Sequence, residues 1–317
     1  MSETGRASEA RIGEAGRAVE AAGATEIIAV NAHHGLVELA AERVGDQSGE
    51  PLLLIMGLGT QMIYWPDELC AQFTAAGFAV ARMDNRDVGL STHLDHFGTP
   101  SLLRMLVKPR AAAAYRLDDM ADDTVAVLDA LGWASAHVVG ASLGGMVAQT
   151  LACQHPDRVR SLTSIMSTPS PGIGRPAMRA LRVLLSKPGT DRAGAQQHAV
   201  GLFRTIGSPG YPTNEDWLRD AAGRAFDRAP AGRGGLRQLA AIRASGDRRS
   251  ALAGVRVPTL VIHGDRDPMI QPAGGRATAA AIPGARLVTF PGMGHDLPAP
   301  LWPRFVAEIR ALAFGSG

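Results

Sequence analysis

The stretch that most constrains this chain covers residues 137–155 and reads H-V-V-G-A-S-L-G-G-M-V-A-Q-T-L-A-C-Q-H. A short β-branched run comes first, and helix-compatible spacing follows Ser142. A serine between glycines, with a strand before it and a helix after it, is typical of a nucleophile elbow. Side chains at Gly140 and Gly144 would collide with the strand and the helix in so tight a turn. The pattern therefore predicts a nucleophilic serine, against the alternative of an ordinary strand–helix turn with an incidental one.

Apolar runs alternate with helical patterns on both sides of this stretch. Residues 51–56 read P-L-L-L-I-M, as expected of a strand buried on both faces of a parallel sheet. Residues 27–30 and 36–42 are expected to pair as an antiparallel hairpin around His33-His34-Gly35. The alternation predicts an α/β fold, a mostly parallel sheet with helices on both faces. Further strands are expected at 78–83, 162–166, 259–263 and 286–290, and helices at 117–131, 273–281 and from about residue 301.

A change in amino-acid composition after Thr168 indicates an insertion into this alternation of strands and helices. Proline and glycine become frequent there, and Gly/Pro breaks separate the helical stretches that follow. The first residues of the chain are rich in Ala, Gly, Glu and Arg and carry no recognisable chemistry. We expect residues 1–25 to form a loose N-terminal arm. Residues 26–169 and 251–317 are expected to form the core, and residues 170–250 a helical cap.

Charge is unevenly distributed along the chain. The formal net charge is only +2, but residues 170–250 contain thirteen Arg and one Lys against six acids, a local balance of +8 that leaves −6 for the remainder. Such a segment fits arginine-rich helix faces in water. It also fits a surface that attracts an anionic substrate or a membrane surface, and the sequence leaves both interpretations open.

Several classes of protein are disfavoured by composition. No apolar run is long enough to span a bilayer, and the N-terminal stretch lacks the apolar region of a signal peptide. Cys70 and Cys153 lie in expected helices and indicate reduced, buried thiols. No Cys/His cluster has metal-ligand spacing. We therefore expect a cytoplasmic protein with no metal, cofactor, nucleic-acid partner or integral membrane segment, while peripheral membrane contact and oligomeric state stay open.

A serine nucleophile needs a base that takes its proton and an acid that orients the base. After a nucleophile elbow these follow in the order acid, then histidine, each on a loop after a strand. Of nine histidines only His295 follows the last expected strand, in F-P-G-M-G-H-D. The glycines of this loop allow the imidazole to reach the elbow. His295 is therefore the predicted base.

The loop H-G-D-R-D-P, residues 263–268, provides the acid. Asp265 and Asp267 are both candidates, and Asp267 is favoured because it lies two residues further along and is fixed by Pro268. Asp265 is expected to cap the loop. The strand that follows the elbow helix ends without an acidic residue, so it offers no rival. Asp84 and Arg86, in D-N-R-D-V-G-L-S, are expected to be a structural loop pair instead of catalytic groups.

An oxyanion hole is predicted from two backbone segments. The residue after the nucleophile, Leu143, supplies one N–H group. Glycines in G-L-G-T, residues 57–60, follow a central strand and let backbone N–H groups point into the space above the sheet. Leu58 is the expected second donor, against the alternative that this segment is a plain strand-to-helix turn.

These motifs together resemble the α/β-hydrolase superfamily, and they extend over the core from residue 26 to 313. Within it the chain most resembles the aclacinomycin methylesterase-like esterases, through M-G after the third strand, W-P-D-E from Trp65, R-D-x-G from Arg86 and G-M-G-H-x-L-P from Gly292. The motifs that carry the superfamily resemblance are L-L-L-I-M-G-L-G, D-N-R-D-V-G-L-S-T, H-V-V-G-A-S-L-G-G-M, P-T-L-V-I-H-G-D-R-D-P and I-P-G-A-R-L-V-T-F-P-G-M-G-H.

The resemblance implies a Ser142, Asp267, His295 triad under a helical cap. The cap sequence does not match closely, so the resemblance implies no polyketide substrate. A serine at the elbow argues against the dehalogenase and epoxide hydrolase branches, which use aspartate. We expect hydrolysis of a small-molecule carboxylic ester through an acyl-enzyme. The alternatives are a thioesterase or phospholipid esterase with an anionic substrate, and a non-catalytic ligand-binding protein of the same fold.

Overall fold

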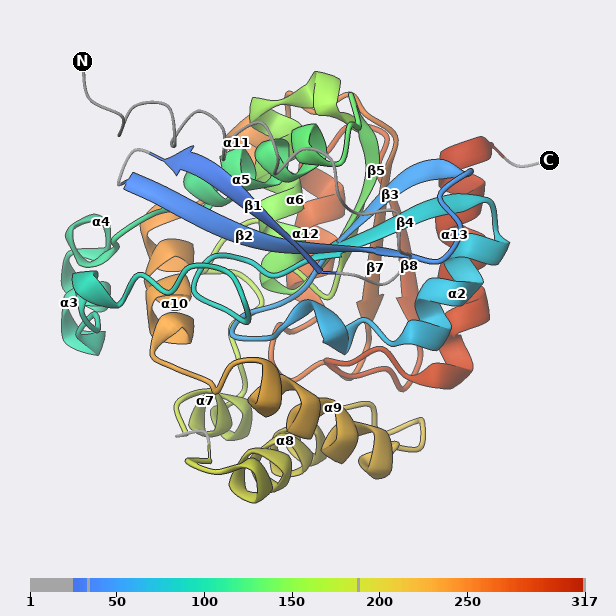
Figure 1. The fold of residues 1–317 in the computed structure, drawn as a ribbon. Coiled ribbons are helices and arrows are strands. Elements are labelled where there is room, and N and C mark those ends of the chain that lie inside the picture. The colour runs from blue at the N-terminus through green and yellow to red at the C-terminus, as the bar shows by residue number, and fades with distance from the viewer. Residues whose placement is uncertain (1–24, 33–34, 187–188, 316–317) are drawn as a thin grey trace, which may run out of the picture.

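The computed structural model describes residues 25–32, 35–186 and 189–315. Its centre is an eight-stranded sheet with the strand order β1-β2-β4-β3-β5-β6-β7-β8 (Figure 1). β2 runs antiparallel to both β1 and β4, and all other neighbours are parallel. This arrangement confirms the predicted α/β fold and the antiparallel first hairpin. The strands are β1 Thr25–Ala32, β2 Gly35–Val44, β3 Glu50–Ile55, β4 Phe78–Met83, β5 Ala136–Ala141, β6 Val159–Ile165, β7 Thr259–Gly264 and β8 Arg286–Phe290.

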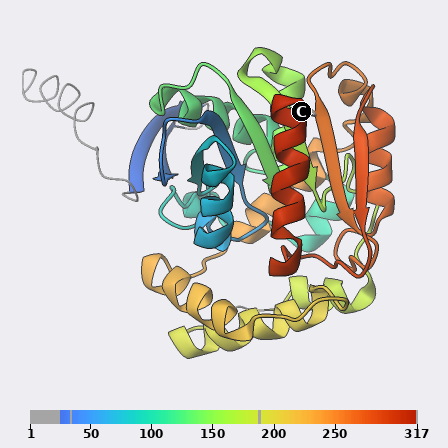
Figure 2. The same ribbon diagram turned by 90° about the vertical axis from the view of Figure 1, so that its right-hand side faces the viewer.

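Helices cover both faces of the sheet because side chains alternate along each strand. On β3, Leu53 and Ile55 belong to a buried cluster with α5 (Leu117–Ala130) and α6 (Leu143–Gln154). Leu52 and Leu54 belong to a second cluster, on the opposite face. Helices α2 (Asp67–Ala75) and α13 (Trp302–Phe314) cover that face, and Figure 2 shows α13 in front of the sheet.

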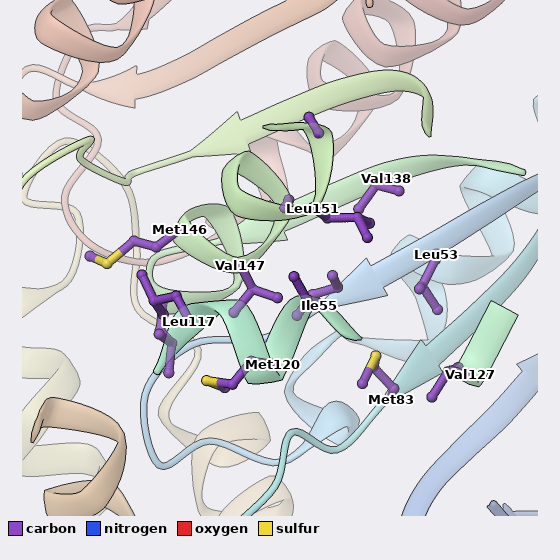
Figure 3. Close-up of a cluster of buried hydrophobic side chains, with 14 of the residues drawn as sticks. Leu53, Ile55, Met83, Leu117, Met120, Val127, Val138, Met146, Val147 and Leu151 are labelled. Atoms are coloured by element: carbon purple, nitrogen blue, oxygen red, sulfur yellow. The ribbon is translucent and has the colours of Figure 1, made fainter. Parts of the chain in front are cut away.

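The first cluster fixes the helix that follows the elbow. Val147 and Leu151 of α6 point toward Ile55 and Val138 of the central strands (Figure 3). All four side chains are fully buried. Each contributes on the order of 1.5–3 kcal/mol through removal of apolar surface from water. The start of α6, and with it residue 142, is therefore held in place by the core.

Between β6 and β7 the described residues form five helices. Helices α7 (Met178–Leu184), α8 (Arg192–Ile206) and α9 (Glu215–Arg228) form a layer beyond the ends of the strands (Figures 1 and 2), where α8 packs against both α7 and α9. Helix α10 (Gly234–Ser245) returns to the core, and α11 (Arg249–Leu252) leads into β7. Asp191 and Asn214 begin α8 and α9 by accepting hydrogen bonds from the backbone N–H groups of the first turns.

Residues 94–116, where the sequence predicts no regular element, contain two short α-helices. These are α3 (Leu102–Val107) and α4 (Pro109–Ala112), and both pack against α10. Cys70 is buried as expected, whereas Cys153 is only half-buried because it lies near the end of α6. Among the residues described, no helix is both long and apolar enough to cross a membrane. The predicted N-terminal arm, except Thr25, lies outside the described residues, as do His33 and His34.

Candidate active site

Ser142 occupies the turn between β5 and α6 in a strained backbone conformation. Its φ and ψ angles are 56° and −117°, in a region that non-glycine residues seldom adopt. The predicted need for glycine on both sides is confirmed. A β-carbon on Gly140 would lie 2.1 Å from the carbonyl oxygen of Gly144, and one on Gly144 would lie 2.0 Å from that of Ile55. The turn therefore requires glycine at both positions and projects the serine side chain away from the sheet.

The structure brings the three residues predicted as a triad into one hydrogen-bonded chain. Nε2 of His295 lies 3.0 Å from Oγ of Ser142, and Nδ1 of the same ring lies 2.7 Å from Oδ2 of Asp267. His295 is on the loop after β8, and Asp267 is on the loop after β7. The carboxyl ends of neighbouring parallel strands thus position His295 and Asp267, the predicted base and acid, beside the elbow.

Asp267 is buried, and both of its carboxylate oxygens have hydrogen-bond partners. Its Oδ1 atom accepts hydrogen bonds from the backbone N–H groups of Met269 and Ile270, at 2.8 and 2.9 Å. Its other oxygen faces the imidazole of His295. An ionised carboxylate only accepts hydrogen bonds, so the proton of a neutral His295 ring lies on Nδ1 and leaves Nε2 free to accept the serine O–H. Asp265 is exposed and instead accepts the N–H of Gly292, which ties the two loops together.

A second histidine, His263, lies against Asp267. Its Nε2 atom is 3.5 Å from Oδ2 of Asp267 but lies closer, 2.8 Å, to the carbonyl oxygen of Ile270. Burial lowers the pKa of His263, which favours the neutral ring. A neutral Nε2–H donated to the carbonyl oxygen leaves no cation to compete with His295 for the carboxylate.

The two predicted oxyanion segments meet at the serine. A β-carbon on Gly57 would lie 3.2 Å from Cβ and 3.7 Å from Oγ of Ser142, so the loop after β3 passes directly over the elbow. The backbone N–H groups of Leu58 and Leu143 have no hydrogen-bond acceptor within the described part of the chain. Free N–H groups beside a nucleophile are what an oxyanion hole requires.

Gln238 of α10 holds the loop after β3. Its Oε1 atom accepts the N–H of Gly59 at 2.7 Å, and its Nε2 donates to the carbonyl oxygen of Arg86 at 2.8 Å. The side chain is fully buried. The sequence does not indicate this residue, because a single glutamine in a helix carries no motif and its partners lie about 150 to 180 residues away in the chain.

The end of α8 and the connection that follows it hydrogen-bond to the loop that carries His295. The sequence did not indicate this contact either. The carbonyl oxygen of Ile206 accepts the N–H of His295 at 2.7 Å, and Oγ of Ser208 accepts that of Gly294 at 2.8 Å. Ser208 also donates to Asp296, whose carboxyl pKa is raised by burial. The only signal in the sequence is the run G-S-P-G-Y-P, residues 207–212, which is one of the Gly/Pro breaks between the helical stretches.

The prediction that Asp84 and Arg86 pair with each other is wrong. Asp84 pairs with Arg228 of α9 at 3.0 Å, whereas Arg86 makes two hydrogen bonds of 2.6 and 2.7 Å to Asp123 of α5. All except Arg228 are fully buried, and a buried charge needs a partner in good geometry. The two neighbours in sequence therefore anchor different helices, and neither contacts the serine.

No cluster of three or more His, Cys, Asp or Glu side chains that could hold a metal ion occurs among the described residues.

The fold and the elbow together define the class of protein. The family model for the alpha/beta hydrolase fold matches residues 50–298, and the chain belongs to this family.

Within the family, the chain is similar to methylesterases. It is 34% identical over 311 residues to rhodomycin D methylesterase DauP of Streptomyces sp. strain C5, and 32% identical over 310 residues to rhodomycin D methylesterase DnrP of Streptomyces peucetius. Each match covers 87% of this chain and 94% of the relative. A crystal structure of a hydrolase from Pseudomonas aeruginosa PA01 matches with a TM-score of 0.65 and 26% identity, over 92% of this chain and 98% of that one.

Proposed function

We propose that this protein is a carboxylic ester hydrolase that uses Ser142, His295 and Asp267 as a catalytic triad. The observation that carries the proposal is the hydrogen-bonded chain from the serine hydroxyl through the imidazole to a buried carboxylate, at 3.0 and 2.7 Å. The two methylesterase relatives support an ester as the substrate, and a methyl ester is the form we propose.

The residues have separate roles in the proposed reaction. Ser142 Oγ attacks the ester carbonyl while Nε2 of His295 takes its proton. The imidazolium then protonates the leaving alcohol, and an acyl-serine remains. His295 next removes a proton from water, which attacks the acyl carbon and releases the carboxylic acid. Asp267 stays ionised throughout and stabilises the transient imidazolium.

The N–H groups of Leu58 and Leu143 would stabilise the negative oxygen of each tetrahedral intermediate. Both are backbone groups, so their side chains are not essential to this role. The position of the Leu58 N–H depends on the loop after β3, which Gln238 holds at Gly59. Gln238 is thus a positioning residue for the oxyanion hole, and it does not itself contact the reacting atoms.

We expect Gln238→Met to lower kcat roughly tenfold to a hundredfold with little change in KM. Removing an oxyanion donor outright costs about a hundredfold to a thousandfold, and a displaced donor costs less. Steady-state kinetics on a p-nitrophenyl ester measure the effect. Gln196→Met is the matched control, because Gln196 of α8 also bonds to backbone, at the carbonyl oxygen of Arg219, but lies apart from the loop after β3. Equal losses in both variants, or a loss confined to KM, would contradict the positioning role.

We further propose that residues 170–250 act as a cap over this site, on a core formed by residues 26–169 and 251–317. The contacts of Ile206 and Ser208 with the histidine loop, and of Gln238 with the loop after β3, support this division. A cap with such contacts contributes to the catalytic geometry as well as to the shape of the pocket. Residues 1–25 have no role in the proposal.

An anionic substrate, as for a thioesterase or phospholipid esterase, remains the second candidate because the cap is basic. Ion pairs reduce its available charge. Seven of the thirteen arginines in residues 170–250 pair with acids: Arg192, Arg204, Arg219, Arg224, Arg228, Arg237 and Arg249. Four of the paired acids, Asp227, Glu215, Asp220 and Asp247, are already counted in the local balance of +8. The pairs of Arg224, Arg228 and Arg237 with Asp67, Asp84 and Asp87, which lie outside the segment, lower that balance further. This partial neutralisation favours an uncharged ester.

The test compares turnover of a neutral methyl ester, a neutral p-nitrophenyl ester and an acyl-CoA thioester by the native chain at 20 and 300 mM NaCl. We expect hydrolysis of the neutral esters with kcat/KM unchanged by salt, since screening acts only on charged substrates. Preference for the thioester, with kcat/KM falling at high salt, would establish the anionic alternative. Thermal stabilisation by these ligands without any product would identify a binding protein and refute the enzymatic proposal.

A further inference from the structure

Helix α3 presents an apolar face to solvent. The exposed fractions of Leu102, Leu103, Leu106 and Val107 are 48, 70, 65 and 67%. Their spacing of three and four residues places them on one side of the helix. Four large apolar side chains within six residues form a contiguous patch of the kind that marks an interaction site. We call these four residues the α3 patch.

The fold holds the α3 patch outward. Met105, on the other side of the helix, is only 2% exposed and anchors α3 to the body of the protein. Before the helix, the carbonyl oxygen of Gly98 accepts a hydrogen bond from the buried side chain of Arg237 at 3.1 Å. Both α3 and α4 pack against α10. The packing of α3 and α4 against α10 therefore keeps the α3 patch exposed to solvent.

Positive charge surrounds the patch. Arg104, Lys108 and Arg110 are exposed, and none of them forms an ion pair with a described residue. Residues 96–117 contain no Asp or Glu. Leucines interleaved with arginine and lysine are typical of elements that lie in the membrane interface, where apolar side chains enter the acyl boundary and cations meet lipid phosphates.

We propose that α3 and α4 dock this protein onto an anionic lipid bilayer, with the α3 patch inserted and Arg104, Lys108 and Arg110 at the headgroups. The positive side chains around the patch favour an anionic lipid surface as its partner. A symmetric contact between two copies of the patch would bring the same cations together. The chain's own residues 1–24 offer only Met1, Ile12 and Val19 as large apolar side chains.

Vesicle flotation with the full-length chain tests the proposal. The probes are vesicles of phosphatidylcholine alone and of phosphatidylcholine with 30 mol% phosphatidylglycerol. We expect binding to the anionic vesicles at least tenfold tighter than to the neutral ones, and a marked loss in 0.5 M NaCl. Replacing Arg104, Lys108 and Arg110 together by Gln should weaken binding roughly a hundredfold. Leu103→Ser with Leu106→Ser should weaken it roughly tenfold or more.

Met178→Ser with Leu185→Ser is the matched control. These side chains are 64 and 43% exposed in and after α7, which also carries arginines. Thermal unfolding midpoints show that each variant is folded. Equal binding to both vesicle types, or equal losses in the two double variants, would overturn the proposal.

A second copy of the chain, or the chain's own N-terminus, could cover the α3 patch instead of a bilayer. Each would give a distinct result, and either result would overturn the proposal. A chain that ignores vesicles but is dimeric, and becomes monomeric with Leu103→Ser and Leu106→Ser, uses the patch for self-association. A chain that binds vesicles only after removal of residues 1–24 keeps the patch covered by its own N-terminus. Vesicle binding requires no ester hydrolysis, so this test is independent of the proposed triad.

Discussion

Ser142→Ala is expected to lower kcat for ester hydrolysis by a factor on the order of 10⁴ to 10⁶, with KM nearly unchanged. Loss of the nucleophile removes covalent catalysis, while the oxyanion hole and substrate binding remain and leave a small residual rate above that in water. Methyl ester and p-nitrophenyl ester kinetics measure the change, and active-site titration excludes contaminating native enzyme. The thermal unfolding midpoint should stay within a few degrees, because only one hydroxyl is removed.

The structure provides a matched control for this variant. On the same sheet, Oγ of Ser161 lies 2.8 Å from Nδ1 of His137, which is a second serine–histidine contact. Ser161 is on a strand, not on a strained turn, and the contact is at the opposite ends of β5 and β6 from the elbow. Ser161→Ala should retain kcat within about twofold. Retention of most activity by Ser142→Ala would show that the elbow is not the source of catalysis.

The sequence was informative where chemistry depends on neighbouring residues. The elbow needs glycine at positions 140 and 144 because backbone atoms approach to about 2 Å from where a β-carbon would lie. Strands and helices of the core follow from apolar periodicity, and β8 and α12 (Ala273–Ala281) have the predicted bounds. The approach of His295 and Asp267 to the serine followed from their places in the chain, each on a loop after an expected strand, because parallel strands end at one edge of the sheet.

Contacts between distant segments were not predictable in the same way. Ser208 and Gln238 act on loops about 90 and 180 residues away, and each uses a single polar side chain that could equally face solvent. The partners of Asp84 and Arg86 were missed for a related reason. Buried charges pair with whichever opposite charge the packed helices bring into good geometry, and proximity in sequence does not decide this.

Asp267→Asn is expected to lower kcat about 10⁴-fold without comparable loss of binding, as for other triads in which the acid is replaced by its amide. The hydrogen bonds around Asp267 explain why the asparagine variant would keep the conformation of this loop and still lose catalysis. Oδ1 of Asp267 accepts the N–H groups of Met269 and Ile270, so an asparagine oxygen would take that position.

The asparagine NH₂ group would then face Nδ1 of His295, which must become an acceptor and shift its proton to Nε2. In that tautomer Nε2 no longer accepts the Ser142 proton. Asp265→Asn is the control, because an amide oxygen at 265 can still accept the Gly292 N–H, and its kcat should fall less than threefold. If Asp265→Asn proved as damaging as Asp267→Asn, the orienting role would belong to the loop and not to one carboxylate. A full loss confined to Asp267→Asn, with an unchanged unfolding midpoint, would place that role on the carboxylate that faces His295.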